Sequence, residues 1–143
     1  MVHVQRTFTV NQPVDVVVDY LKDFSRAEQW DPGTQSCIRV GTGPVEVGTT
    51  WENVSKVRGR DTTLKYRLER LEPHRLTFVG KNKTATSTDD MTFTALQGET
   101  QIQYDSNIVF NGIAKLADPF MRREFEKLGD ETVRDMTRVL DGL

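Results

Sequence analysis

The apolar residues of this chain change their spacing once, and that change limits the folds available to it. Between residues 36 and 109 they recur at every second position, in short segments separated by turn sequences such as EPHR and LQGE. A period of two is typical of strands with one buried face, and short connections between strands favour antiparallel pairing. After about Gly112 the spacing becomes three and four residues, which is typical of an amphipathic helix. The pattern therefore predicts an antiparallel meander followed by one long helix.

Six strands are expected in the meander, and a seventh precedes it near the N-terminus. Val4, Phe8 and Val10 alternate with polar residues and predict this first strand, in which Arg6 shares their parity. Either a bulge turns Arg6 outward or its charge is paired inside, and the pattern is compatible with both. The later strands are expected at Ser36–Val40, Thr49–Val57, Thr62–Leu71, Arg75–Gly80, Thr84–Thr94 and Thr100–Val109.

Two short helices are expected between the first and second strands. Asn11 is a candidate N-cap, and Pro13 suits the first turn of the helix that follows. A second brief helix is expected at Arg26–Gln29, before the sequence WDPG breaks it. The apolar spacing of the first helix comes from Val14, Val17, Val18 and Leu21.

The C-terminal helix is expected to begin at Asp118, a candidate cap before Pro119, after a shorter helical lead-in. Its single apolar stripe needs an apolar surface to lie on, and the inner face of the sheet is the surface available. One helix, about 10–12 Å across, cannot fill the concave side of a curled seven-stranded sheet, so a ligand-sized space is expected between them. The stripe consists of Leu116, Phe120, Phe125, Leu128, Met136, Val139 and Leu140.

Strand parity predicts which residues line that space. Polar side chains among them would cost about 1–3 kcal/mol each if they were buried without partners, so a hydrated or ligand-filled cavity suits them. Plain core packing is the alternative role for any single one. The predicted ligand-binding residues are Trp51, Asn53, Tyr66, Phe78, Ser87, Met91 and Tyr104 from the strands, with Phe120 and Leu128 from the helix.

Three polar residues of the predicted strands are candidates for catalysis. The hydroxyl of Tyr66 or Tyr104 could orient a carbonyl group or protonate an enolate. Strand parity continued from Ser87 would bury Asp89 and raise its pKa, as a general base requires. A bulge would instead put Asp89 and Asp90 in a solvated bend, and this is the arrangement that we expect.

Cysteine and histidine are too sparse to suggest a metal site. His3, His74 and Cys37 are scattered, so neither a metal nor a cofactor is expected. Cys37 lies opposite in parity to Ile38 and Val40, and is expected to face outward or towards an edge as an inert thiol. A lone cysteine and an N-terminus unlike a signal peptide predict a cytoplasmic location.

Charge argues against a nucleic-acid partner. The formal net charge is −2, and no basic motif with interleaved aromatic residues is present. Residues 56–83 contain nine Lys or Arg against three acids, which alternation assigns to a solvated outer face, with a binding patch as the alternative. No apolar run approaches the ~20 residues of a membrane span. We expect a single domain at 1–143, as a monomer or a weak homodimer.

Several segments resemble one known family. The segment PVDVVVDYLKDFSRAEQWDPG is similar to the opening signature of the polyketide cyclase/dehydrase and lipid-transport family, a member of the START-like (SRPBCC, helix-grip) superfamily. The segments VGTTWENVSKVRGRDTTLKYRLERLEPHRLTFVG and ATSTDDMTF resemble its central strands. The resemblance implies an α+β helix-grip fold, in which a seven-stranded curved antiparallel sheet wraps a long C-terminal helix. It also implies that Trp30, after the two short helices, packs beneath the closed end of the cavity, as a plug, a ligand contact, or both.

Three functions follow from this reading. The first is binding or carriage of a small hydrophobic ligand, lipid-like or aromatic and polyketide-like, in the internal cavity. The second is a cyclase or dehydrase that uses the same cavity. The third is a protein-interaction module that uses the basic strands or the long helix. Family members include both carriers and aromatase/cyclases, so the resemblance leaves the presence of an enzyme activity open.

Overall fold

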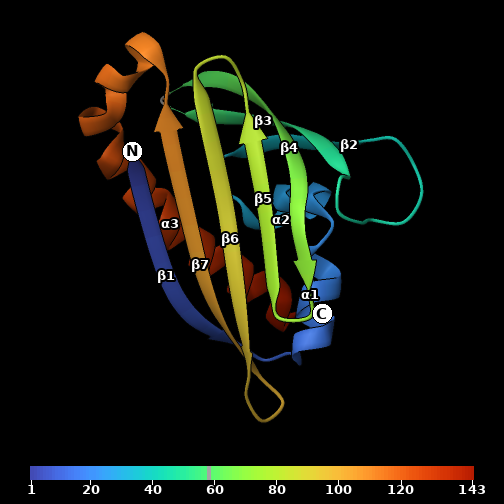
Figure 1. Cartoon of the computed structure of the whole chain (residues 1–143). Coiled ribbons are helices and arrows are strands. Elements are labelled where there is room, and N and C mark those ends of the chain that lie inside the picture. The colour runs from blue at the N-terminus through green and yellow to red at the C-terminus, as the bar shows by residue number, and fades with distance from the viewer. Residues whose placement is uncertain (58) are drawn as a thin grey trace.

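The computed structural model describes residues 1–57 and 59–143 and, within them, all side chains except those of residues 57, 113 and 117–120. Seven strands form one antiparallel sheet in the order β1-β7-β6-β5-β4-β3-β2. From β2 to β7, strands that are consecutive in the sequence lie side by side in the sheet, as the short turns predict. The first strand, β1, pairs with β7 (Figure 1). The strands are β1 (Val2–Val10), β2 (Thr34–Val40), β3 (Thr50–Val57), β4 (Arg60–Glu72), β5 (Arg75–Lys81), β6 (Ala85–Ala95) and β7 (Thr100–Phe110).

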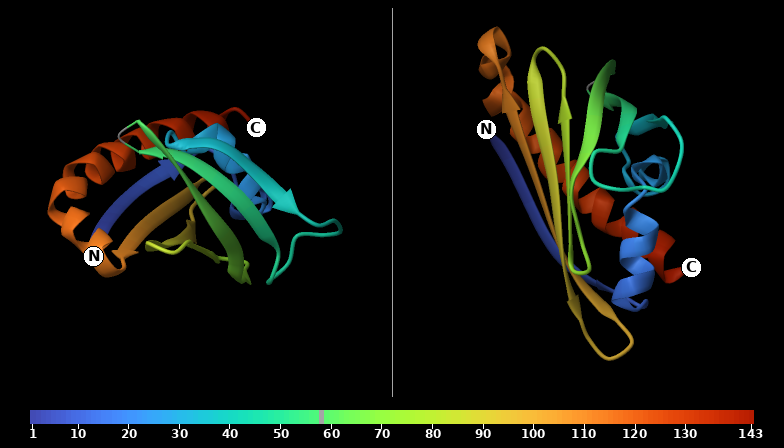
Figure 2. Two further views of the ribbon diagram at one scale, coloured as in Figure 1. Left: turned by 90° about the horizontal axis from the view of Figure 1, so that it is seen from above. Right: turned by 45° about the vertical axis from the view of Figure 1, so that its right-hand side comes forward.

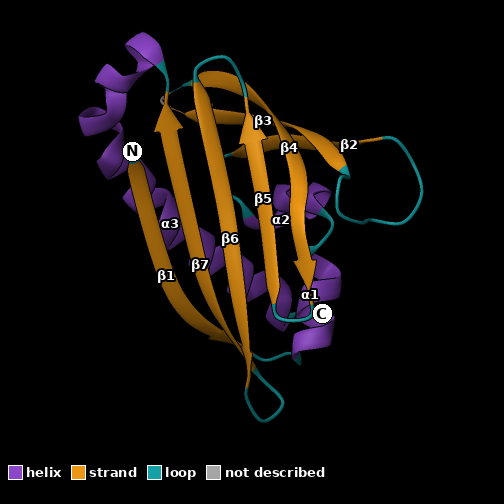
Figure 3. Cartoon of the chain, in the orientation of Figure 1, coloured by secondary structure: helices purple, strands orange, loops and turns teal. Residues whose placement is uncertain are grey.

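The helices lie together on one side of the sheet. Figure 2 shows the strands curling around that side, with the long C-terminal helix crossing it diagonally. Figure 3 shows the short helices beneath the half of the sheet that contains β4 and β5. The helical segments are α1 (Val14–Leu21), the 3-10 turn η1 (Phe24–Arg26), α2 (Ala27–Trp30), the 3-10 turn η2 (Gly112–Ala117) and α3 (Asp118–Asp141). The expected helix-grip fold is confirmed.

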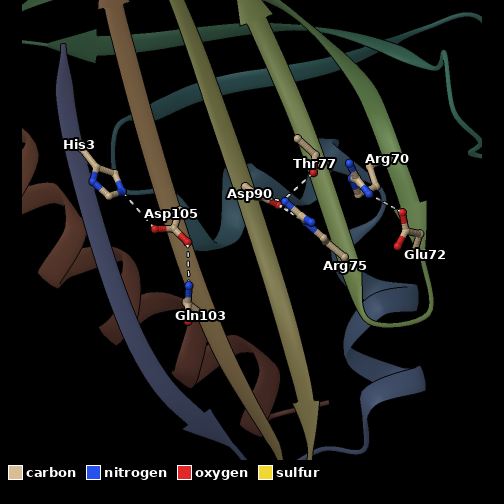
Figure 4. A network of polar contacts seen from close by, with 8 residues as sticks. All are labelled: His3, Arg70, Glu72, Arg75, Thr77, Asp90, Gln103 and Asp105. Atoms are coloured by element: carbon tan, nitrogen blue, oxygen red, sulfur yellow. Dashed lines mark hydrogen bonds and ion pairs between the residues drawn. The ribbon is translucent and has the colours of Figure 1, made fainter.

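The two faces of the sheet separate apolar from charged side chains. On the inner face, Leu68, Leu76, Ile102 and other apolar residues are fully buried. The outer face carries charged and polar residues that pair across neighbouring strands (Figure 4). Arg75 donates to both carboxylate oxygens of Asp90, at 3.1 and 2.8 Å, and Thr77 donates to the same carboxylate. Period-two alternation in the sequence therefore becomes an apolar interior and a solvated exterior.

Two predictions of the direction in which a strand side chain points are corrected. In β2 the register shifts between Thr34 and Ser36, so the parity of the following residues is inverted. Cys37 is consequently buried and Ile38 is exposed, contrary to the expectation that Cys37 faces outward or towards an edge. In β6 the pairing with both neighbours is regular, so Asp89 stays at inward parity and is buried, whereas a solvated bend was expected.

Two details at the helix ends also differ from expectation. Asn11 does not cap α1: the N-cap is Pro13, and the backbone N–H of Asn11 instead donates to the carboxylate of Asp141 at 2.8 Å, which ties β1 to the end of α3. Leu116 was placed in the buried stripe, but it lies in η2 and 73% of it is exposed. The stripe is buried further along α3, where Met136 and Leu140 are inaccessible to solvent.

The long helix packs closely on one edge strand. Gly129 lies where α3 crosses β1, and a Cβ atom added there would come 2.5 Å from Cγ1 of Val4. Arg6 of β1 reaches the same helix, where its guanidinium pairs with Glu126 at 2.7 Å and Asp130 at 2.9 Å. The pairing of β1 with β7 is regular at Arg6. Of the two possibilities for Arg6, the paired arrangement therefore applies.

Replacing Gly129 by alanine tests this close approach. Alanine favours a helix interior by about 1 kcal/mol over glycine, but its methyl group would collide with Val4. We expect Gly129→Ala to lower the free energy of unfolding by about 1–3 kcal/mol, measured by urea denaturation. Lys127→Ala at an exposed position of α3 is the control, with an expected change within about 0.5 kcal/mol. A more stable Gly129→Ala protein would show that α3 lies farther from β1.

Candidate functional site

A cavity of about 200 Å³ lies between the inner face of the sheet and α3. The strands supply most of its wall, the turn after α2 supplies one side, and α3 covers the side opposite the sheet. The lining residues are Asp31, Gly33, Ser55, Thr62, Leu64, Tyr66, Thr84, Ala85, Ser87, Asp89, Tyr104, Ser106, Ile108, Phe110, Met121, Phe125 and Leu128.

The lining changes from exposed to buried along the strands. At one end Leu64, Phe110 and Met121 are half-buried, and Thr84 is exposed. At the other end lie four buried residues with polar groups, which together form the floor of the cavity: Tyr66, Ser87, Asp89 and Tyr104. The cavity therefore has a largely apolar mouth and a polar floor.

Gly80 allows Tyr66 to reach the floor. In the sheet, Gly80 of β5 lies between Tyr66 of β4 and Ser87 of β6. A Cβ atom at Gly80 would come 2.6–2.8 Å from the ring of Tyr66. The ring consequently rests over the bare backbone of β5, close to Ser87 and Asp89.

A carboxyl–phenol pair occupies the centre of the floor. The hydroxyl of Tyr104 donates to Oδ1 of Asp89 at 2.8 Å, from neighbouring strands. Burial raises the pKa of Asp89 to about 7, and the hydroxyls of Tyr104, Ser106 and Tyr66 limit the rise because they favour the carboxylate. Burial, with the nearby Asp89 charge, raises the pKa of both tyrosines well above 10. At neutral pH the tyrosines are therefore donors, while Asp89 can either give or accept a proton.

Asp31 is a second carboxyl group of the cavity, and the sequence did not nominate it. It follows α2, and its oxygens accept from the backbone N–H of Gly33 at 3.1 Å and the hydroxyl of Thr34 at 2.9 Å. Burial raises the pKa of Asp31, and its charge contributes to the raised pKa of Asp89. In the sequence it is only the Asp of a DPG turn. Its position depends on how α2 packs beneath the sheet, which local patterns do not report.

Five predicted ligand-binding residues lie in the packed part of the interior, outside the described lining of the cavity. Four of them are large apolar side chains that fill the closed end around Phe24, whose ring centre lies 4.5 Å from that of Phe78 and 6.1 Å from that of Trp51. Asn53, the fifth, bonds within the protein to Thr34. The five are Trp30, Trp51, Asn53, Phe78 and Met91.

Trp30 packs behind the floor. Its ring meets Phe24 and Tyr104 edge-on, at centroid distances of 5.9 and 6.2 Å. It is 1% exposed, and its indole N–H has no hydrogen-bond partner among the described residues. Of the two roles expected for Trp30, this position matches the plug, which holds α2 against the ring of Tyr104.

Four of the five remaining predicted ligand-binding residues line the cavity. Tyr66, Ser87 and Tyr104 line the cavity, as does Leu128 from α3, together with Met121 and Phe125. The predicted contact of Phe120 falls on a side chain outside the described part of the structure.

Among the described residues, no cluster of ionisable side chains suggests a metal site. In the part of the chain that the structure describes, no three His, Cys, Asp or Glu side chains are grouped as metal ligands. Cys37 is buried, which raises its pKa to about 12, so its thiol stays protonated and poorly nucleophilic. Likewise, no helix within residues 1–57 and 59–143 has the length and apolarity that crossing a membrane requires.

Comparison with known proteins identifies both a family and a set of similar folds. The family described as "Polyketide cyclase / dehydrase and lipid transport" matches residues 1–141. No curated protein matches the sequence significantly.

Three solved structures illustrate the similarity of fold. The Zhui aromatase/cyclase from Streptomyces sp. R1128 is 18% identical with a TM-score of 0.74, over 98% of this chain and 91% of its own. A START superfamily protein from Mycobacterium smegmatis is 15% identical with a TM-score of 0.71, over 98% and 94%. The protein TTHA0849 from Thermus thermophilus is 15% identical with a TM-score of 0.75, over 98% and 94%. At these identities the likeness shows a shared START-like fold.

The raised pKa of Asp89 predicts a pH-dependent stability. Unfolded, the carboxyl titrates near 3.8; folded, it keeps its proton until about pH 7. Between these values the folded state binds more protons, so the free energy of unfolding falls as pH rises through this range. An Asp89→Asn protein lacks this penalty and can still accept the Tyr104 bond. We expect its stability relative to wild type to be greater at pH 8 than at pH 5 by about 2–3 kcal/mol, measured by urea denaturation.

The adjacent residue provides a matched control. Asp90 faces outward and bonds to Arg75, which lowers its pKa. Its stabilising contribution is present above its unfolded pKa and is lost only in acid, so Asp90→Asn should destabilise the protein to a similar extent at pH 5 and pH 8. If the two variants showed the same pH dependence, Asp89 would have to titrate like an ordinary surface carboxyl.

Proposed function

Because this chain belongs to the polyketide cyclase/dehydrase and lipid-transport family, we propose that it binds a small, largely apolar ligand in the cavity between the sheet and α3. The observation that carries the proposal is the cavity itself: about 200 Å³, an apolar mouth and a polar floor. Buried polar groups without ligand or protein partners are costly. A ligand with one polar end would satisfy the floor while its apolar body fills the mouth.

The volume limits the size of the ligand. An apolar cavity of about 150 Å³ accommodates benzene, so about 200 Å³ suits a core of one or two rings. A longer molecule would extend past the half-buried residues at the mouth, such as Leu64 and Met121. The packed rings at the closed end leave the floor as the limit of penetration.

Two alanines on β6 provide a matched test of binding in the cavity. Ala85 is buried in the lining, whereas Ala95 lies exposed at the other end of the same strand. In Ala85→Leu, three added carbons occupy ligand space, so we expect the affinity for 1-naphthalenemethanol to fall by about tenfold or more, equivalent to about 1.4 kcal/mol. The affinity of Ala95→Leu should equal that of wild type, both measured by naphthalene fluorescence. Equal affinities in all three proteins would place the ligand elsewhere.

A second candidate function, a cyclase or dehydrase, is favoured by the pair of Asp89 and Tyr104. A carboxyl with a pKa of about 7 can abstract a proton from a carbon next to a carbonyl at neutral pH. The phenol of Tyr66 or Tyr104 can donate a hydrogen bond to the resulting enolate oxygen. In this role the cavity would hold a poly-β-ketone or its aldol product, with the reacting carbon against the floor.

Turnover of a poly-β-ketone substrate by Asp89→Asn and Tyr104→Phe separates the enzyme from the carrier. If Asp89 is the base, Asp89→Asn should lower kcat by about 10²–10⁴-fold, and binding of 1-naphthalenemethanol should persist. Asp90→Asn, on the outer face, is the control. Unchanged kcat in Asp89→Asn would reject the catalytic role and leave the carrier function standing.

A further inference from the structure

The ionisable groups of the cavity are all acids. Among the described lining residues, the ionisable side chains are the carboxyls of Asp31 and Asp89 and the phenols of Tyr66 and Tyr104. No Lys, Arg or His occurs in that described lining. Lys65 and Arg67 of β4 are exposed on the outer face, and Arg6 of β1 pairs with Glu126 and Asp130 of α3. The described ionisable groups of the cavity can therefore carry only negative charge, which the small net charge of the chain does not reveal.

We propose that the cavity selects ligands whose buried end carries a protonated amine, and rejects those that end in a carboxylate. The inference rests on the proposed ligand-binding function and specifies its ligand class. It predicts a preference among molecules of equal size and shape, so it can fail while binding in the cavity stands.

Asp89 is the carboxyl that such an amine would meet. Oδ1 of Asp89 accepts the bond from Tyr104, and a carboxylate has about four lone-pair sites in total. The hydroxyls of Ser106 and Tyr66 also favour its carboxylate, which leaves about one site for an ammonium group in the cavity. Asp31 accepts from Gly33 and Thr34 and adds a second negative charge to the lining. Asp89 supplies the contact because it lies on the buried floor, between Tyr66 and Tyr104.

The same arrangement works against an anionic ligand. An ammonium–carboxylate hydrogen bond inside a protein is about twice as strong as a neutral one. A ligand carboxylate would instead face two acids with no described basic residue in the lining to neutralise it, so one carboxyl would have to bind a proton. Like charges placed against the wrong ligand are a recognised source of specificity.

Ligand binding should consequently be coupled to the protonation of Asp89. The groups that face Asp89 are Asp31 after α2, Tyr66 of β4 and Tyr104 of β7, and α3 presents the uncharged Met121, Phe125 and Leu128. Two groups lie further out: Asp135 of α3 acts on Asp31, and Cys37 of β2 acts on Tyr66. Asp89 has a pKa of about 7. An amine holds Asp89 ionised and releases its proton, whereas a carboxylate holds it protonated.

Three naphthalene probes of nearly equal size test the ligand class: 1-naphthylmethylamine, 1-naphthalenemethanol and 1-naphthoate. We expect the amine to bind at least about tenfold tighter than the naphthoate at pH 8. Amine affinity should rise from pH 6 to pH 8 as Asp89 ionises. Calorimetry of the amine at pH 7 in phosphate and in Tris should detect release of about half a proton per amine bound.

Two variants test whether Asp89, on the floor of the cavity, causes the preference for amines. In Asp89→Asn the ratio of amine to alcohol affinity should approach one, and proton release should disappear. Asp90→Asn, which changes the same charge on the outer face, should keep both. Proton release by the wild-type protein needs no variant, so the proposal stays testable if Asp89→Asn folds poorly.

The possible outcomes distinguish a failure of the amine preference from a failure of ligand binding in the cavity. Equal affinities for the three probes, or a preference for naphthoate, with Ala85→Leu still weakening binding, would overturn the amine preference alone. If no probe bound, or if Ala85→Leu bound them all as well as wild type, the proposed cavity function would fail too. An amine preference that survives in Asp89→Asn but is lost in Asp90→Asn would place the amine on the outer face and overturn the proposal.

Discussion

The cavity exists because α3 is much narrower than the sheet that curls around it. Seven strands curl around a single helix, and that helix is held close to β1 by Gly129 and by the pairing of Arg6 with Glu126 and Asp130. A helix only about 10–12 Å wide that is committed to one edge strand cannot also fill the space beneath the central strands. The closed end is filled instead by aromatic rings grouped around Phe24. What is left is a hollow with a packed base and a half-buried rim.

The polar floor follows from the position of that hollow. Ser87, Asp89 and Tyr104 occupy inward positions on β6 and β7 that line the hollow between the sheet and α3. Gly80 leaves room for Tyr66 to join them. Burial then raises the pKa of Asp89 into the neutral range, where its protonation can respond to a ligand. A carrier and an enzyme would draw on the same floor, and they differ in whether the Asp89 proton moves during a reaction.

Sequence periodicity predicted the fold more fully than the site. Alternation and turn spacing were enough for the order of β2 to β7, and the change of period was enough for α3, because both depend on local patterns. The pairing of β1 with β7 joins distant segments and was not predicted. Parity failed in β2, where a bulge turned Cys37 inward. In β6 parity was right and the expected bulge was wrong, because regular pairing keeps Asp89 inside. Parity also could not separate packed from lining residues, since Phe78 and Ser87 both face inward. Asp31 was missed because its place depends on the docking of α2.

The most direct test of the account asks where a ligand lies. In protein with ¹³C-labelled methyl groups, bound 1-naphthalenemethanol should give nuclear Overhauser effects to the methyl groups of Ala85, Ile108 and Leu128. These residues line the cavity from β6, β7 and α3. Effects confined to Val14, Val18 and Leu71, which line a separate groove between α1 and the β4–β5 turn, would contradict it. The first result would establish that the hollow beneath α3 binds ligands, and the second that it is only a packing defect.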